Sequence, residues 1–142
     1  MNDKEEIFKT PYIELFYYPQ KRLSVYRYLP DSADMSDEEY KEWNLKYAEA
    51  IEQHQIIYTL VDIKNMRFTI EPYLQEWTNE EINTRLVNAG VKKCALLTPE
   101  EFIIHLAAEQ TTDEIEAHRP ENQYKIRYFN NFAKAEKWLL EG

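Results

Sequence analysis

The chain has 142 residues, of which 44% are hydrophobic and 30% charged, with a net charge of -9 and one cysteine. This length and composition fit one globular domain, and they exclude a disordered chain and a fold held by internal disulfides. The excess of acidic residues repels phosphate groups, so nucleic acid is not an expected partner.

The first residues are charged, and neither a signal peptide nor an apolar run long enough to cross a bilayer follows them. Together with the single cysteine, this predicts a cytoplasmic protein without membrane insertion. We expect residues 1–10 to be a flexible N-terminus and residues 11–142 to form a single α/β domain.

Two runs rich in β-forming residues come first, at 12–18 and 23–29, and the turn residues between them predict an antiparallel hairpin. After a loop, a capping box that starts at Ser36 predicts a helix reaching about His54. The unbroken apolar run at 56–63 then predicts a central strand that is covered on both faces.

The second half alternates between helices and strands. Residues 72–89 have helical spacing and end at Gly90, while a further capping-box pattern at Thr78 predicts a kink or two shorter helices. The remaining predicted elements are strands at 94–97 and 124–129, a helix from Thr98 to about Ala117, and a last helix after Asn131. This order predicts a mixed, mostly parallel sheet with an N-terminal β-hairpin and with helices packed on it.

Three short packing motifs occur along this order of elements. They are Leu60-Val61-Asp62 at the end of the central strand, the turn from Gly90 to Ala95, and Tyr128-Phe129 followed by Ala135, Trp138 and Leu139. With these motifs the chain resembles, over residues 12–140, the STAS-like fold of anti-sigma-factor antagonists. It is most similar to the bacterial branch that is called stage-II-sporulation-AA-like. The resemblance implies a non-catalytic binding domain.

The turn after the central strand departs from that family. Antagonists of the family carry a phosphorylatable serine there, in an Asp-Ser-Ser-Gly-like sequence. In this chain the turn runs from Asp62 to Thr69 and contains neither serine nor glycine, so that Thr69 is its only hydroxyl residue. A partner switch driven by a kinase is therefore not expected.

Motifs for catalysis and cofactor binding are not found in the sequence. Two glycines in the whole chain are too few for a phosphate-binding loop, a dinucleotide fingerprint or a nucleophile elbow. His54, His105 and His118 do not have the spacing of metal ligands, and Cys94 lies in an apolar strand without a nearby base. We expect no enzymatic activity, no metal and no cofactor.

The corner after the central strand is the candidate interaction surface. Asp62 stands where open α/β sheets bind ligands, although bonding to the N–H groups of the following loop is the simpler interpretation. Met66 and Phe68 either form an exposed contact or pack beneath the loop. The predicted surface consists of Asp62, Met66, Arg67, Phe68, Thr69, Tyr73 and Trp77.

Three functions remain open. The first hypothesis is a binding module that contacts another protein, or a copy of itself, through this surface. The second is a carrier of a small apolar ligand or lipid, and the third is an enzyme that uses Asp62 with a histidine. A closed core would favour the binding module. An apolar cavity of several hundred Å³ would favour the ligand carrier, and a polar pocket around Asp62 would favour the enzyme.

Overall fold

The computed structural model describes residues 4–101 and 124–141. Within them, six strands form one sheet in the order β1-β2-β3-β4-β5-β6. Neighbours among the first three strands are antiparallel, and the pairs from β3 to β6 are parallel. The strands are β1 (Glu5–Lys9), β2 (Ile13–Tyr18), β3 (Leu23–Tyr28), β4 (Tyr58–Asp62), β5 (Lys93–Leu97) and β6 (Lys125–Phe129). The predicted mixed sheet with an N-terminal hairpin is confirmed.

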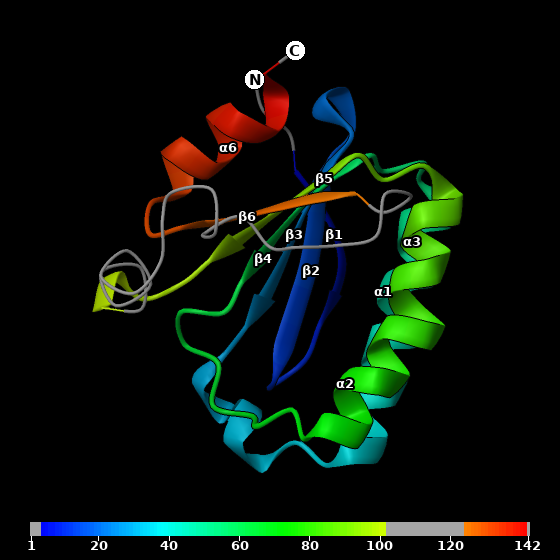
Figure 1. Cartoon of the computed structure of the whole chain (residues 1–142), viewed down its shortest axis with the longest axis vertical. Coiled ribbons are helices and arrows are strands. Elements are labelled where there is room, and N and C mark those ends of the chain that lie inside the picture. The colour runs from blue at the N-terminus through cyan, green and yellow to red at the C-terminus, as the bar shows by residue number, and fades with distance from the viewer. Residues whose placement is uncertain (1–3, 102–123, 142) are drawn as a thin grey trace.

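Helices cover both faces of this sheet (Figure 1). One face packs against α1, α2 and α3, and the other face packs against α6. The α-helices are α1 (Asp37–Gln53), α2 (Pro72–Thr78), α3 (Thr84–Ala89) and α6 (Phe132–Leu140). A π-helical turn, η3 (Asn79–Asn83), joins α2 to α3, and the short 3₁₀ turns are η1 (Pro19–Lys21) and η2 (Pro30–Asp34).

The alternation of side chains along the strands produces two separate cores. In β3, Tyr26 and Tyr28 belong to the core beneath α1, whereas Leu23 and Val25 belong to the core beneath α6. Successive residues of a strand point to opposite faces, which accounts for this division. Strand β4 lies between β3 and β5, so the prediction of an internal central strand is confirmed.

The N-terminal segment differs from the sequence prediction. Residues 5–9 were expected to be part of a flexible N-terminus, but they form β1, which pairs with β2 at the edge of the sheet. Its exposed positions carry charged residues such as Glu5, Glu6 and Lys9. Charges are common on edge strands because they discourage pairing with other chains, and they also give the sequence its unstructured appearance.

The helix boundaries follow the predicted signals in most places. The capping box of Ser36 is present, α1 ends at Gln53 with His54 as its C-cap, Gly90 takes a left-handed conformation with φ of 98°, and Asn131 caps α6. The prediction of a kink or two shorter helices at Thr78 is confirmed, because η3 separates α2 from α3 there. Thr78 does not cap a helix, however, since its hydroxyl donates to the Leu74 carbonyl. The helix predicted from Thr98 to about Ala117 lies almost entirely outside the described residues.

Candidate functional site

A cavity of about 270 Å³ lies between the sheet and the layer formed by α1, α2, η3 and α3. Side chains of the helical layer between positions 40 and 47 and between 78 and 86 line one side of it, and side chains of β3 to β6 line the other. The loop at 63–71 closes the cavity at one end. The lining residues are Tyr26, Tyr28, Tyr40, Asn44, Tyr47, Val61, Ile63, Met66, Ile70, Thr78, Ile82, Asn83, Leu86, Cys94, Leu96, Tyr124 and Ile126. We call this space the tyrosine cavity.

Stacked tyrosine rings build the wall between the sheet and α1. The rings of Tyr26 in β3 and Tyr47 in α1 are parallel, with an interplanar angle of 2° and centroids 4.1 Å apart. Tyr28 meets Tyr26 edge-on with centroids 5.4 Å apart. Such pairs add to the stability that comes from burial, and they hold each ring in a fixed orientation.

The hydroxyls of the helical tyrosines are hydrogen-bonded to threonines. Tyr47 Oη lies 2.6 Å from Thr59 Oγ1, which also accepts a hydrogen bond from Ser24. Tyr40 Oη lies 2.8 Å from Thr78 Oγ1. Because the single proton of the Thr78 hydroxyl goes to the carbonyl of Leu74, the Tyr40 hydroxyl is the donor in its pair.

Two amide side chains bond the other tyrosines of the wall. The Tyr124 hydroxyl donates to Asn83 Oδ1 over 2.9 Å, which ties the start of β6 to the π-helical turn. Asn44 Nδ2 donates to the Tyr40 carbonyl over 2.8 Å and reaches Tyr28 Oη at 3.5 Å. A π-helical turn displaces the side chains that follow it, and such turns are frequent at functional sites.

The hydroxyl of Tyr26 differs from these groups. Among the side-chain atoms of the described residues, it is the one buried polar atom without a hydrogen-bond partner. The hydroxyl of Tyr28 is close enough to influence the pKa of Tyr26, but the two groups do not have hydrogen-bonding geometry. Burial, and then the neighbouring tyrosines, raise the pKa of Tyr26 well above 10.0, so it remains a proton donor at neutral pH.

The 63–71 loop forms a wall of the cavity. Met66 and Ile70 line the cavity, and Phe68 stacks on Tyr40 with ring centroids 5.1 Å apart. The residues between them, Arg67 and Thr69, are exposed. Met66 and Phe68 are therefore half-buried against the core, as in the second of the two arrangements that the sequence left open.

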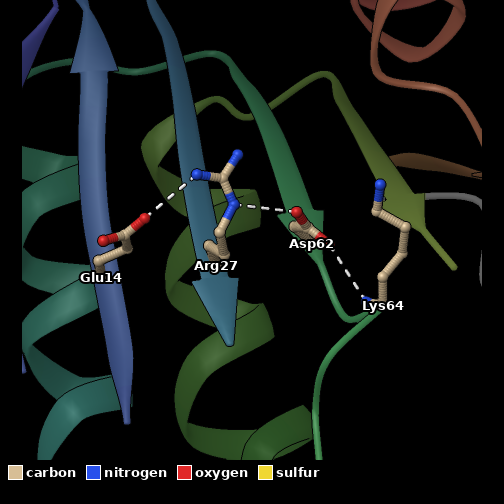
Figure 2. Close-up of polar contacts among 4 residues, drawn as sticks. All are labelled: Glu14, Arg27, Asp62 and Lys64. Carbon is tan, nitrogen blue, oxygen red and sulfur yellow. Dashed lines mark hydrogen bonds and ion pairs between the residues drawn. The ribbon is translucent and has the colours of Figure 1, made fainter. Parts of the chain in front are cut away.

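Asp62 is held in a chain of charged and polar contacts across β2, β3 and β4 (Figure 2). Arg27 donates from Nε to Asp62 Oδ2 over 2.9 Å and from Nη1 to Glu14 Oε1 over 3.1 Å. The other Asp62 oxygen accepts the backbone N–H of Lys64 over 3.1 Å. Asp62 thus bonds the loop that follows it, and it does not line the tyrosine cavity.

The other residues of the predicted surface lie at the outside of the same corner. Tyr73 in α2 is 55% exposed. Trp77, one turn later, is half-buried, and Lys41 lies over its ring. Of the seven predicted residues, the structure brings only Met66 to the cavity.

The residues considered for chemistry are dispersed in the described structure. Cys94 is buried in β5 and lines the cavity, whereas His54 caps α1 and packs against Tyr17. His105 and His118 lie outside the described residues. Within residues 4–101 and 124–141, no group of three or more metal-ligating side chains comes together. The same ranges contain no helix that is long and apolar enough to span a bilayer.

Sequence reasoning missed the tyrosine cavity, although two signals for it are present. Apolar and polar residues alternate from Met66 to Ile70, which is typical of an extended segment with one buried side. Tyr40 and Tyr47 are seven residues apart, so they share one face of a helix. Neither signal reveals that the packed rings leave a space between them.

The comparisons with known proteins agree with this architecture. The model of one protein family, SpoIIAA-like, matches residues 32–140, which is more than half of the chain. Searches of curated proteins and of solved structures found no match. The matched range includes the central strand, the helices that enclose the cavity, and α6. The chain therefore belongs to the SpoIIAA-like family and has a STAS-like α/β fold.

Proposed function

We propose that this protein is a non-catalytic binding module that takes up a small, mainly apolar ligand in the tyrosine cavity. The observation that carries the proposal is the cavity itself, about 270 Å³ in volume and lined mostly by aromatic and aliphatic side chains. Ligand sites are concave and mostly apolar, with a few placed polar groups, and the volume of this cavity lies just below their usual range of about 300–1,000 Å³.

The chemistry of the lining supports binding over catalysis. The polar groups that the described residues contribute to it are hydroxyls, amides and one buried thiol, and burial raises the pKa of Tyr28, Tyr40 and Tyr47 as well as that of Tyr26. A tyrosine with a raised pKa is a poor general base at neutral pH. STAS-like domains are generally non-catalytic regulatory modules, which agrees with this proposal.

The test is binding of naphthalene, a neutral apolar probe of suitable size, by the whole chain. We expect naphthalene to raise the melting temperature and to bind with one site per chain. Val61→Phe places a ring in the cavity and is expected to abolish binding. Leu140→Phe, at an exposed position of α6, is the control and is expected to bind normally. Equal binding by both variants would contradict the proposal.

A second candidate function is protein contact at the outer corner, which the exposed ring of Tyr73 favours. Aromatic residues are enriched in protein interfaces, and STAS-like domains typically mediate protein–protein interactions. A photo-crosslinking residue at position 73, expressed in the native host, is expected to capture a specific protein or a second copy of the chain. The same residue at the exposed position of Leu45 in α1 is the control. The same products from both positions would contradict this candidate.

A further inference from the structure

The volume of the tyrosine cavity limits the size of its ligand. A cavity of about 150 Å³ accommodates one benzene ring, so about 270 Å³ corresponds by proportion to roughly ten or eleven non-hydrogen atoms. This is the size of a two-ring molecule, and it is too small for a lipid with two acyl chains. Of the ligands that the sequence left open, the cavity fits the small molecule and not the lipid.

The lining also sets the charge of the ligand. Among the residues that the structure describes, the lining contains no Asp, Glu, Lys, Arg or His, and its tyrosines remain protonated because burial raises their pKa. The ion pairs of Arg27 with Asp62 and Glu14 on the sheet involve residues that do not line the cavity. An ionised ligand would lose its hydration without gaining a counter-charge, which is strongly unfavourable. The ligand is therefore neutral.

The hydrogen bonds of the wall show which polar group the ligand carries. Tyr40 and Tyr124 already donate to Thr78 and Asn83. The Tyr47 hydroxyl is bonded to Thr59, and that of Tyr28 accepts from Asn44. Tyr26, only 2% exposed, lacks a partner among the described residues, and its ring is fixed by the stack on Tyr47. An unpartnered buried donor costs about 1–3 kcal/mol, and a ligand acceptor that reaches it after a small shift of the side chains covering the hydroxyl removes that cost.

We propose that the tyrosine cavity binds a neutral two-ring molecule that bears one hydrogen-bond acceptor, such as a ketone oxygen, and that the Tyr26 hydroxyl donates to this acceptor. This inference rests on the proposed ligand-binding function and specifies its ligand. Tyr26 is then the residue that determines specificity, and the remaining tyrosines provide the shape of the site.

The test compares two molecules that differ by a single group. 1-Tetralone has a ketone next to its aromatic ring, and tetralin has the same two-ring skeleton without the ketone. Dissociation constants are measured by calorimetric titration with wild-type protein, Tyr26→Phe and Tyr17→Phe. Tyr17 is a buried tyrosine of β2 that faces the same core without lining the cavity. The anion 2-naphthoate tests the exclusion of charge.

We expect 1-tetralone to bind the wild-type protein about five- to tenfold more tightly than tetralin, which corresponds to one net hydrogen bond. Tyr26→Phe is expected to remove this preference and to retain tetralin binding, while Tyr17→Phe behaves like the wild type. 2-Naphthoate is expected to show no binding.

Each contrary result has a distinct meaning. Equal affinity of the wild-type protein for 1-tetralone and tetralin would contradict the claim that the ligand carries an acceptor, and it would leave the proposed function intact. A ketone preference that persists in Tyr26→Phe overturns the role of Tyr26, and tight binding of 2-naphthoate overturns the neutrality of the ligand. If no neutral probe binds the wild-type protein, both this inference and the proposed function fail. The wild-type comparison decides the question of the acceptor even if Tyr26→Phe does not fold.

Discussion

Tyr26 and Tyr47 stack ring on ring between the sheet and α1, yet only one of their hydroxyls is hydrogen-bonded. The Tyr47 hydroxyl lies 2.6 Å from that of Thr59, whereas the Tyr26 hydroxyl is buried without a partner. Two neighbouring residues of the same type thus contribute differently to stability, because a satisfied buried hydroxyl stabilises the fold and an unsatisfied one opposes it.

Removal of the Tyr26 hydroxyl and removal of the Tyr47 hydroxyl are therefore expected to have opposite effects on the free energy of unfolding. Tyr26→Phe should leave the ligand-free protein as stable as the wild type or more stable, by up to about 1 kcal/mol. Tyr47→Phe should destabilise it by about 1 kcal/mol, since its hydrogen bond to Thr59 is lost. Urea unfolding of the two variants measures both effects. A loss in Tyr26→Phe as large as that in Tyr47→Phe would show that the Tyr26 hydroxyl is satisfied in solution.

The alternation in the 63–71 loop predicts a second contrast. Met66→Asp with Phe68→Asp should lower stability by several kcal/mol, because charges replace side chains packed against the core and the stack on Tyr40 is lost. Arg67→Asp with Thr69→Asp, at the exposed positions of the same loop, should change stability by less than about 1 kcal/mol. Thermal unfolding compares the pairs, and a small effect of the first pair would place Met66 and Phe68 on an outer contact surface.

The contacts of Asp62 predict that it is a structural residue of this corner. Asp62→Ala removes the partner of Arg27 and the acceptor for the Lys64 N–H, and we expect a loss of about 2–3 kcal/mol. Glu52→Ala removes an ion pair with Arg85 whose side chains are 39% and 35% exposed, and should cost less than about 1 kcal/mol. Chemical denaturation provides both values. Similar small losses would contradict the structural role.

The buried tyrosines predict loss of stability at alkaline pH. Burial raises the pKa of Tyr26, Tyr28 and Tyr47 above the ordinary value of 10.0. Above that pH the unfolded chain releases protons that the folded chain retains, so the contribution of these tyrosines is complete below pH 10 and decreases above it. Above pH 10, each of these tyrosines lowers the free energy of unfolding by up to about 1.4 kcal/mol per pH unit.

The measurement is urea unfolding at a series of pH values from 8 to 12. Tyr26→Phe should make the free energy of unfolding decrease less steeply above about pH 10, because the variant lacks the hydroxyl proton that Tyr26 retains in the folded protein. A free energy of unfolding that stays constant through this range, or an unchanged slope in the variant, would show that these hydroxyls ionise as easily in the folded protein as in the unfolded chain.

Local signals in the sequence predicted most of the described fold. The apolar run at 56–63 indicates an internal strand because both of its faces are covered, and the Ser36 capping box and Gly90 act within a few residues. Strand β1 was missed because its charged residues face solvent at the sheet edge, and only its pairing with β2 makes it a strand.

The candidate site was harder to predict because it depends on distant contacts. Met66 and Phe68 were recognised as unusual, but their direction depends on the rings of α1 beneath the loop. The cavity forms where Tyr26, Tyr47 and Tyr124, from three separate parts of the chain, fail to fill the space between the layers. Volume left by packing is a property of the assembled core, and no local pattern of residues encodes it.

The most direct test of the account is the location of a bound neutral probe. Intermolecular nuclear Overhauser effects can be recorded between 1-tetralone and the methyl groups of the protein. We predict contacts with the methyls of Val61, Ile82 and Leu86, which line the cavity, and none with those of the exposed Leu45 and Leu140. Contacts with Leu45 or Leu140 instead, and none with the three lining residues, would contradict the claim that the tyrosine cavity is the binding site.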